Sequence, residues 1–354
     1  MDIYVLNTSF EKIGVIDYCE SIIWTKRYCA TGDFELYLPA TSEALEILQD
    51  GNLVMREDDQ TSLMVIKNIV LKTDAEEGDY ITVSGPSIES YIAKRIIWQQ
   101  TNLSGLVTDC ITTLLDQNLI APSIGARKIN NVVIGSYCDC DISITKQITG
   151  DNLLDAIINL LNTYNLGFSL TFDGINLNFN IYEGTDRSYD QSANAYVTFS
   201  SEFDNLLAST YQASSENYKN VAMIAGEGSG VSRKNYVVGN ASGINRDEVY
   251  VDARDISSNT DEGTLTPTQY DALLAERGNE ALAEAIATQD YEGEIEPNVN
   301  YIFNQDYYLG DIVNLENQYE MTSTVRIIEV IESWDENGYS CIPTFKSKEV
   351  EQWV

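Results

Sequence analysis

The chain has 354 residues, 44% of them hydrophobic and 21% charged, which is typical of a folded globular protein with more than one domain. Its net charge of −34 argues against a nucleic-acid-binding surface, because such surfaces depend on clustered Lys and Arg. Histidine is absent, which excludes catalytic triads, zinc sites and pH switches that need a histidine.

The cysteines and the apolar runs exclude two further classes. No secretory signal is visible in the first residues, MDIYVLNTSF, and no apolar run approaches the ~20 residues that a membrane span needs. The six cysteines are scattered, which favours buried thiols over a disulfide framework. They are Cys19, Cys29, Cys110, Cys138, Cys140 and Cys341.

The first part of the chain, residues 1–86, is predicted to be a β-barrel-like module. Short runs of β-branched residues alternate with turn residues as far as Pro39. Thr41 or Ser42 then caps a short helix that ends near Leu48. Further strands complete the module.

The middle of the chain, residues 87–200, is predicted to be a small α+β domain. Apolar residues at helical spacing predict one helix over 103–115 and a second over 153–164, with Asp151 as the cap of the second. Strict alternation then predicts a β-hairpin over 168–181.

The last part, residues 201–354, is predicted to be a second β-barrel-like module that carries an inserted polar loop and one long helix. Thr266 caps this helix and Pro267 occupies its first position, so we expect it over 267–289. Gly278 weakens the helix, because glycine lowers helix propensity. The helix is expected to pack against the module.

Two segments of the chain resemble each other. Residues 51–85 align with residues 310–344 without a gap, and each passes from a Gly through a long strand and an acidic turn to a Tyr-containing strand. The identical pairs are Gly51/Gly310, Val54/Val313, Ile69/Ile328, Glu77/Glu336 and Tyr80/Tyr339. The predicted fold class is therefore α+β and β-rich, with two related β-barrel-like modules, a small α+β domain and one long helix.

Two short motifs suggest chemistry, and each has a simpler interpretation. The segment Gly226–Gly230 (GEGSG) resembles a phosphate-binding loop but lacks its Lys-Ser/Thr end, so a hairpin tip or mobile loop is favoured. Cys138 and Cys140 have a spacing found in some thiolate metal sites. Neither a second cysteine pair nor a histidine accompanies them, so a metal site is disfavoured.

Aromatic and acidic residues leave an alternative open. Trp24, Trp98 and Trp334 could form a sugar-binding platform, although aromatic residues on strands are more often core or interface residues. Two carboxylates among the 55 acidic residues would suffice for a glycosidase, yet the sequence identifies no pair. We predict no catalytic, cofactor-binding or metal-binding residue, and we predict that the protein is not an enzyme. An extracellular carbohydrate-binding protein or carboxylate-based glycosidase remains the alternative.

Four segments, in this order and spacing, resemble one protein family. They are IIWTKRYCATGDFELYLP (22–39), YEGTDRS (182–188), KNVAMIAGEG (219–228) and LGDIV (309–313). The chain is similar to siphophage tail-tip proteins, which are related to the baseplate hub of contractile tails. The resemblance runs over essentially the whole chain and offers no catalytic residue. Asp186 and Arg187 are expected to pair with each other or to hold a turn.

The resemblance implies a homotrimeric ring that caps the tail tube. Two similar modules in each of three chains would present a pseudo-sixfold face to a sixfold tube. The expected partners are the tail tube or a distal tail protein on one side and a tip, spike or receptor-binding protein on the other. The expected location is the virion, after assembly in the host cytoplasm. We expect an acidic channel through which DNA passes without specific binding.

Overall fold

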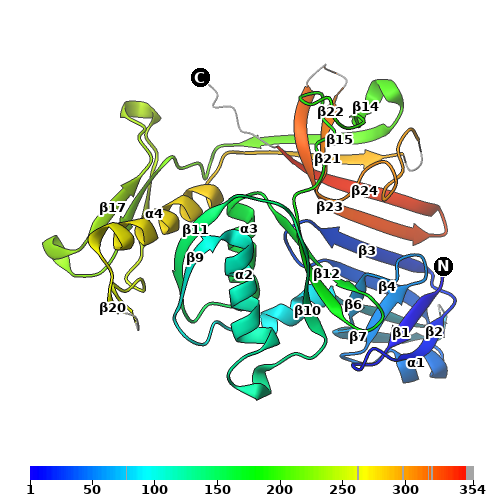
Figure 1. The fold of residues 1–354 in the computed structure, drawn as a ribbon. Helices are drawn as coiled ribbons and strands as arrows, with labels where there is room; N and C mark the ends of the chain where they lie inside the picture. Colours follow the sequence, from blue (N-terminus) through cyan, green and yellow to red (C-terminus); the bar gives the residue numbers. More distant parts are fainter. Residues whose placement is uncertain (77, 261–262, 297–298, 318, 320–321, 348–354) are drawn as a thin grey trace.

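The computed structural model describes the whole chain except residues 77, 261–262, 297–298, 318, 320–321 and 348–354. One long sheet runs along one side of the molecule, and smaller sheets and the helices lie beside it (Figure 1). The predicted β-rich α+β class is confirmed. No helix in the described part of the chain has the length and hydrophobicity of a membrane span.

The long sheet joins strands from the two ends of the chain, seen in blue and in red in Figure 1. Its main path runs β15-β21-β24-β23-β3-β4-β8-β7, and β22 and β14 extend it beside β23. The early strands are β3 (Ser21–Arg27), β4 (Asp33–Pro39), β7 (Asn68–Asp74) and β8 (Gly78–Pro86). The late strands are β14 (Thr198–Ser200), β15 (Leu206–Ser214), β21 (Thr288–Ile295), β22 (Ile312–Glu316), β23 (Thr322–Asp335) and β24 (Gly338–Ser347).

The first module consists of two open sheets rather than a barrel. A four-stranded sheet packs on the early half of the long sheet around a core that includes Trp24, Phe34 and Leu36. To close a barrel, the free edge of β3 would have to pair with another strand of the first module. That edge pairs with β23 instead, so no sheet closes on itself within the described residues. The four-stranded sheet and its helix are β1 (Ile3–Leu6), β2 (Lys12–Ile16), β5 (Leu53–Arg56), β6 (Leu63–Val65) and α1 (Ser42–Ile47).

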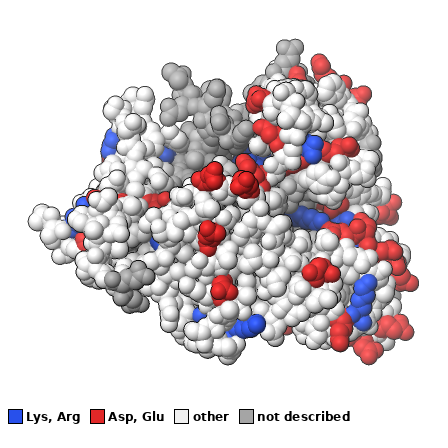
Figure 2. All heavy atoms as spheres, in the orientation of Figure 1, with Lys and Arg blue, Asp and Glu red and all other residues white. Residues whose placement is uncertain are grey.

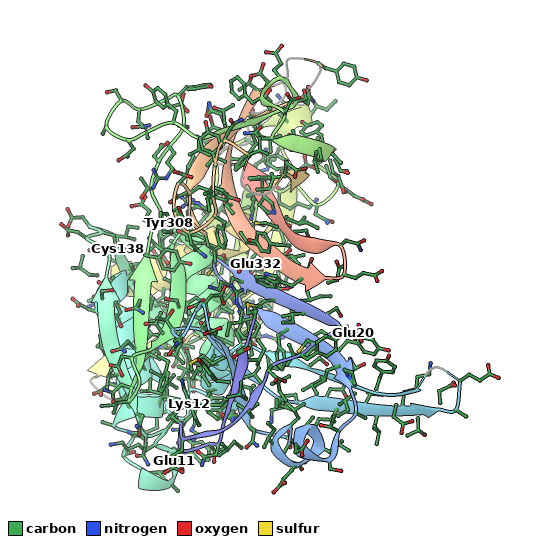
Figure 3. The ribbon with its side chains drawn as sticks, turned by 90° about the vertical axis from the view of Figure 1, so that its right-hand side faces the viewer. Glu11, Lys12, Glu20, Cys138, Tyr308 and Glu332 are labelled. Carbon is green, nitrogen blue, oxygen red and sulfur yellow. The ribbon has the colours of Figure 1, made fainter. Side chains whose placement is uncertain are left out.

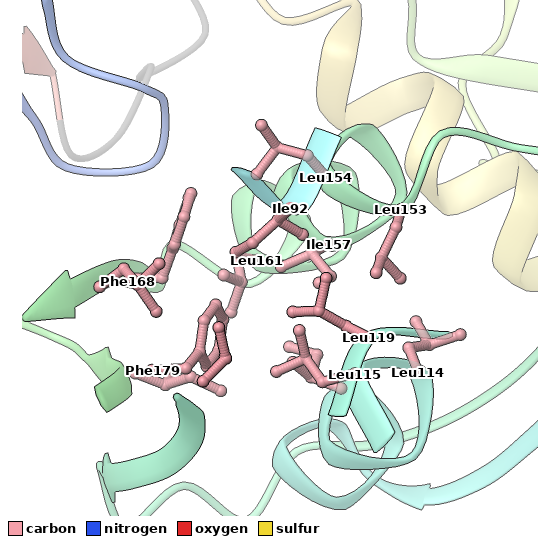
Figure 4. Close-up of a cluster of buried hydrophobic side chains, with 14 of the residues drawn as sticks. Ile92, Leu114, Leu115, Leu119, Leu153, Leu154, Ile157, Leu161, Phe168 and Phe179 are labelled. Atoms are coloured by element: carbon pink, nitrogen blue, oxygen red, sulfur yellow. The ribbon is translucent and has the colours of Figure 1, made fainter. Parts of the chain in front are cut away.

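The middle of the chain surrounds the largest hydrophobic core, which Figure 4 shows in part. Apolar faces of α2 and α3 meet Phe168 and Phe179 of the predicted hairpin there. The elements are η1 (Ile88–Lys94), β9 (Thr101–Leu106), α2 (Val107–Leu115), η2 (Asp116–Ile120), η3 (Gly125–Arg127), β10 (Val132–Tyr137), β11 (Ser143–Ile148), α3 (Leu153–Thr163), β12 (Gly167–Phe172) and β13 (Leu177–Tyr182).

Two details of the middle part differ from the sequence prediction. The helix predicted over 103–115 begins only at Val107, because Thr101–Leu106 forms a strand that pairs with β11. Leu103 and Leu106 lie three positions apart, which is helical spacing, and the pairing with β11 overrides that local pattern. Asn152, and not Asp151, caps α3, since its Oδ1 accepts from the backbone N–H of Leu154 at 3.0 Å.

The long helix occupies a different place from the one predicted. Helix α4 (Pro267–Glu284) ends before 289 and does not pack on the long sheet; it covers a separate sheet and also contacts β11 and α3. Gly278 permits the close contact between α4 and this sheet, since a methyl group there would lie 2.5 Å from Ile224 Cδ1. The separate sheet contains β16 (Val221–Ala225), β17 (Asn235–Val238) and β18 (Glu248–Asp252). Short segments near it are η5 (Gly230–Ser232), η6 (Gly243–Asn245), β19 (Asn259–Thr260) and β20 (Gly263–Thr264), whereas η4 (Ser201–Phe203) contacts β15 of the long sheet.

The internal repeat has a structural counterpart, but its gapless alignment is wrong. Gly51 N donates to Ile66 O (2.9 Å), and Gly310 N donates to Ile327 O (2.8 Å) in the same way. Ile66 therefore matches Ile327, two residues beyond the position that the gapless alignment gives it. The second copy therefore has two more residues between these matched positions, and sequence identity alone did not reveal that insertion. Glu77 of the repeat lies outside the described residues.

Candidate assembly interface

The two halves of the long sheet meet where β3 pairs with β23 in antiparallel fashion. The register runs from Arg27 opposite Glu329 to Ile22 opposite Trp334. Arg27 donates to the Glu329 carboxylate through Nε and to Asp33 Oδ2 through Nη1 at 2.5 Å. This seam fuses strands that lie about three hundred positions apart in the sequence into one continuous sheet.

A buried ion pair supports the seam from its inner side. Arg56 Nη1 lies 2.8 Å from Glu332 Oε2, and each side chain is only 4% exposed. The guanidinium of Arg56 also lies over the ring of Trp334 (4.3 Å to the centroid), and Tyr339 donates to Glu332. Burial alone would lower the pKa of Arg56, but Asp58 and Glu332 outweigh it and raise that pKa. The cation is therefore fixed in place between the two modules.

Both ends of the long sheet remain free edges. Among the described strands, β7 pairs only with β8, and β15 pairs only with β21. Edge strands usually carry charges or bulges that prevent further pairing. Strand β7 carries Lys72 and Asp74, but its Val70 and Leu71 are also 50% and 48% exposed. On β15, Leu207 is 56% exposed and lies at an irregularity in the pairing with β21. The two edges are therefore candidates for pairing with another chain.

A junction cluster joins the two modules to the middle domain. The Tyr28 hydroxyl donates to the carbonyl of Glu183 at 2.8 Å, and Arg326 donates to the carbonyls of Glu183 and Gly310. Asp311, only 1% exposed, accepts from Thr185 N at 2.7 Å. The segments YEGTDRS and LGDIV therefore meet in space. The cluster comprises Tyr28, Gly184, Arg187, Gly310, Asp311 and Arg326.

Asp186 and Arg187 have separate partners. Asp186 Oδ1 accepts from the backbone N–H of Ser188 at 2.9 Å and from its hydroxyl at 2.7 Å, so Asp186 holds a turn as expected. Arg187 Nε donates to Asp311 Oδ2 at 2.7 Å, so this arginine links the middle domain to the second module. The sequence motif gave no sign of this distant partner.

A hollow of about 700 Å³ lies beside the junction cluster, lined by residues of both modules and of the middle domain. Figure 3 shows Cys138 and Tyr308, which line it, on the same side of the molecule. Two of its three acidic lining residues have engaged carboxyl groups: Asp311 pairs with Arg187, and Glu89 accepts from Leu170 N at 2.9 Å, while Glu183 is the third. Burial raises the pKa of Glu89.

The two sequence motifs occupy structural positions. The segment Gly226–Gly230 begins the loop between β16 and β17, and Glu227 accepts there from the hydroxyl and the backbone N–H of Ser258. Burial, and secondly the neighbouring Cys140, raise the pKa of the Cys138 thiol to about 11, which keeps it protonated at neutral pH. Within the described residues no group of three His, Cys, Asp or Glu side chains could hold a metal ion.

The three tryptophans do not form one platform. Trp24 is fully buried in the core of the first module, and Trp334 stacks against Arg56 at the seam. Trp98 is 57% exposed and lines a separate hollow. The seam and the free edges are the parts that sequence reasoning missed, because their partners lie far apart in the chain.

Comparison with known proteins identifies the family. The sequence profile of the family described as Siphovirus ReqiPepy6 Gp37-like protein matches residues 2–345. The chain belongs to this family. The match confirms the predicted resemblance to a siphophage tail protein family. No match was found among curated proteins.

Solved structures share the fold of this Gp37-like chain over nearly its full length. The tail protein from Neisseria meningitidis MC58 is 11% identical, with a TM-score of 0.60 and coverage of 98% of this chain and 96% of that one. The prophage MuSo2 43 kDa tail protein from Shewanella oneidensis is 14% identical (TM-score 0.60, 98% of each chain). Prophage tail protein gp18 from Listeria monocytogenes EGD-e is 13% identical (TM-score 0.58, 99% and 96%). At these identities the likeness shows the fold alone.

Proposed function

We propose that this chain is a structural hub of a phage tail, a homotrimeric ring that caps the tail tube and connects it to a tip, spike or receptor-binding protein. The long sheet carries the proposal, because its strand order contains the same four-strand unit twice. The path consists of β15-β21-β24-β23 followed by β3-β4-β8-β7. When the two halves are compared strand by strand, β15 corresponds to β3 and β23 corresponds to β7. We assign the first module to residues 1–86, the middle domain to 87–200 and the second module to 201–354.

The free edges indicate how copies would join. Within one chain β23 pairs with β3, so pairing of β7 in one copy with β15 in the next would repeat the same seam. Three copies of the eight-stranded path would close a ring of twenty-four strands (3 × 8) with no edge left free. Three copies of two modules also match a sixfold tube. The ring would belong to the virion and assemble in the host cytoplasm.

The inner face of such a ring would form a channel for DNA. Strand alternation places Glu35, Asp33 and Glu329 on the face of the sheet opposite the hydrophobic cores. Among the described side chains of this face, six acids stand against four bases. The acids are Asp33, Glu35, Asp74, Glu316, Glu329 and Asp335, and the bases are Arg27, Lys72, Arg326 and Lys346. A small acidic excess suits DNA that must pass without binding, and the charges within ~8 Å of the axis of a trimer structure would test it.

We assign no catalytic residue, cofactor or metal to the chain. The carboxyl groups of Glu89 and Asp311 in the large hollow already accept hydrogen bonds from the protein itself. Hydrolysis of peptidoglycan or of a capsule by the purified protein, abolished by one Asp or Glu substitution, would contradict this assignment.

Assembly is tested by measuring mass in solution. Val70→Glu places a charge on the free edge β7, so we expect light scattering to show loss of the trimer and a monomer of 39.5 kDa. Val237→Glu is the matched control, because Val237 is 51% exposed against 50% for Val70 and lies on the edge strand β17 of another sheet. A trimer that survives Val70→Glu and also Leu207→Glu on β15 would contradict edge-to-edge pairing.

A further inference from the structure

Four basic side chains gather without acidic partners in a chain where Asp and Glu outnumber Lys and Arg by 55 to 21. They are Lys94, Arg95, Arg127 and Lys128. None of the ion pairs between described residues includes any of the four. Burial, and then repulsion from neighbouring basic groups, lower the pKa of Lys94 and of Arg127, although Asp50, which pairs with Lys67, acts on Lys94 in the opposite direction. A cluster of cations outside any ion pair is a site for an anion that the chain itself does not supply.

The four side chains line two adjacent hollows. One, of about 490 Å³, is lined by Arg127, Trp98 and amide side chains, and the other, of about 520 Å³, by Lys94, Arg95 and Lys128. Arg95 Nε donates to the carbonyl of Arg127 at 2.6 Å, so the hollows share a wall. Neither lining contains an Asp or Glu. Figure 2 shows a few basic side chains at the lower middle edge of the molecule, apart from the acidic side chains that crowd its lower right.

Trp98 adds an aromatic surface to this site. Its side chain is 57% exposed, and its backbone N–H donates to Asn118 Oδ1 at 3.2 Å. The guanidinium of Arg127 lies 5.1 Å from the centre of the Trp98 ring and donates to the carbonyl of Ile96, which holds both groups in place. Gln100 and Gln117 bring amide groups to the same hollow. An exposed indole, amides and free cations together match the apolar ring face, hydroxyls and acid groups of a charged sugar.

We propose that these two hollows form a binding site for an acidic saccharide, with one sugar ring against Trp98 and its carboxylate or phosphate groups on Arg127, Lys128, Lys94 and Arg95. Each hollow has the size of a small-ligand site, and the pair accommodates one or two sugar residues. A long nucleic acid is disfavoured, because the net charge of −34 repels it. The site does not depend on the proposed ring, and it would let a tail protein contact an acidic surface glycan.

Titration calorimetry with the full-length protein tests the site. The probes are a hyaluronan tetrasaccharide, which carries carboxylates, glucose 6-phosphate, neutral maltotetraose, and an eight-residue oligothymidine. We expect at least one acidic probe to bind, more tightly than maltotetraose and oligothymidine, with an affinity that falls as salt rises. Which acidic probe binds identifies the acid group. No binding of either acidic probe at 10 mM, equal binding of maltotetraose, or tighter binding of oligothymidine would overturn the proposal.

Variants separate the two parts of the site. Trp98→Ala should weaken binding about tenfold, as loss of a stacking surface does, whereas Trp98→Phe should retain most of the affinity. The double variant Lys94→Gln/Lys128→Gln should weaken binding and reduce its salt dependence. Lys219→Gln changes the net charge by one away from the hollows and should leave binding unchanged. Unchanged affinity in both the Trp98→Ala and the double-lysine variants would place the ligand elsewhere and overturn the proposal. Solution mass is measured for each variant, so that a change of assembly is distinguished from a change of binding.

Discussion

At the scale of single residues, the junction cluster is fitted so closely that two of its positions exclude any side chain. A methyl group on Gly184 would lie 2.1 Å from the carbonyl oxygen of Gly310. A methyl group on Gly310 would lie 2.5 Å from the ring of Tyr28. Both glycines also have positive φ, +79° and +93°. Backbone, and not a flexible side chain, occupies the space beside Gly184, so the clash there cannot be relieved cheaply.

Gly184→Ala is therefore expected to destabilise the protein by about 3 kcal/mol or more, and to lower its Tm by several degrees in calorimetry. Gly174→Ala provides the control, because Gly174 has a similar φ of +97° but nothing within 4 Å of the added methyl. This control should lower the free energy of unfolding only by the cost of the strained backbone, about 1 kcal/mol. Equal losses in the two variants would show that the close contact with Gly310 contributes nothing.

At the scale of elements, helix α4 is docked on the middle domain by a buried polar cluster. Tyr164 of the middle domain donates to Glu276 Oε1 at 2.6 Å, and Lys146 on β11 contacts Glu280. Glu276 and Glu280 are 9% and 8% exposed and lie one helical turn apart. Burial, and secondarily repulsion from Glu280, raise the pKa of Glu276 despite the Tyr164 hydrogen bond and Lys146.

This raised pKa predicts a pH-dependent stability. The folded protein binds the Glu276 proton more tightly than the unfolded chain, so this group stabilises most below its unfolded pKa, near 4.5. That contribution is lost as the pH rises through the folded-state pKa. Glu276→Gln keeps an acceptor for Tyr164 without the charge, so we expect its Tm to exceed that of the native protein at pH 8 and the difference to shrink towards pH 4. Glu43→Gln on the exposed face of α1 is the control, and an identical trend there would refute the assignment to Glu276.

At the scale of the whole molecule, the charge opposes the proposed assembly. Each copy carries a net charge of −34, and Figure 2 shows acidic side chains gathered on one side of the face in view, over the first module. Copies that meet through β7 and β15 must overcome their mutual repulsion, which extends over ~30 Å in 0.01 M salt but only ~8 Å in 0.15 M.

Salt is therefore expected to favour the trimer. Sedimentation velocity at fixed protein concentration should show a larger trimer fraction in 0.15 M than in 0.01 M sodium chloride. Trimer that dissociates as salt rises would indicate that ion pairs, and not apolar edge contacts, hold the copies together. The Val70→Glu variant should remain monomeric at both salt concentrations.

Local patterns in the sequence determined several elements correctly. Alternation from Phe168 predicted the β12–β13 hairpin, and Thr266 with Pro267 predicted the start of α4, where the structure shows a complete capping box with Gln269. Turns, caps and amphipathic faces depend on residues a few positions apart, so a single sequence carries their full signal. The resemblance to siphophage tail proteins also came from sequence, through four segments, three of which the structure brings together at the junction cluster.

Only the tertiary structure decided how these elements combine. Arg56 and Glu332 are 276 positions apart in the sequence, and no local sequence pattern around either residue indicates that they pair. The β3–β23 pairing turned two expected barrels into one open sheet, and pairing with β11 converted 103–106 from expected helix to strand. Helix α4 covers β16–β18 because its apolar face meets that sheet and not the long sheet. A strand edge or a helix face can pack against any partner of matching shape, so the partner it takes is determined by the fold of the whole chain.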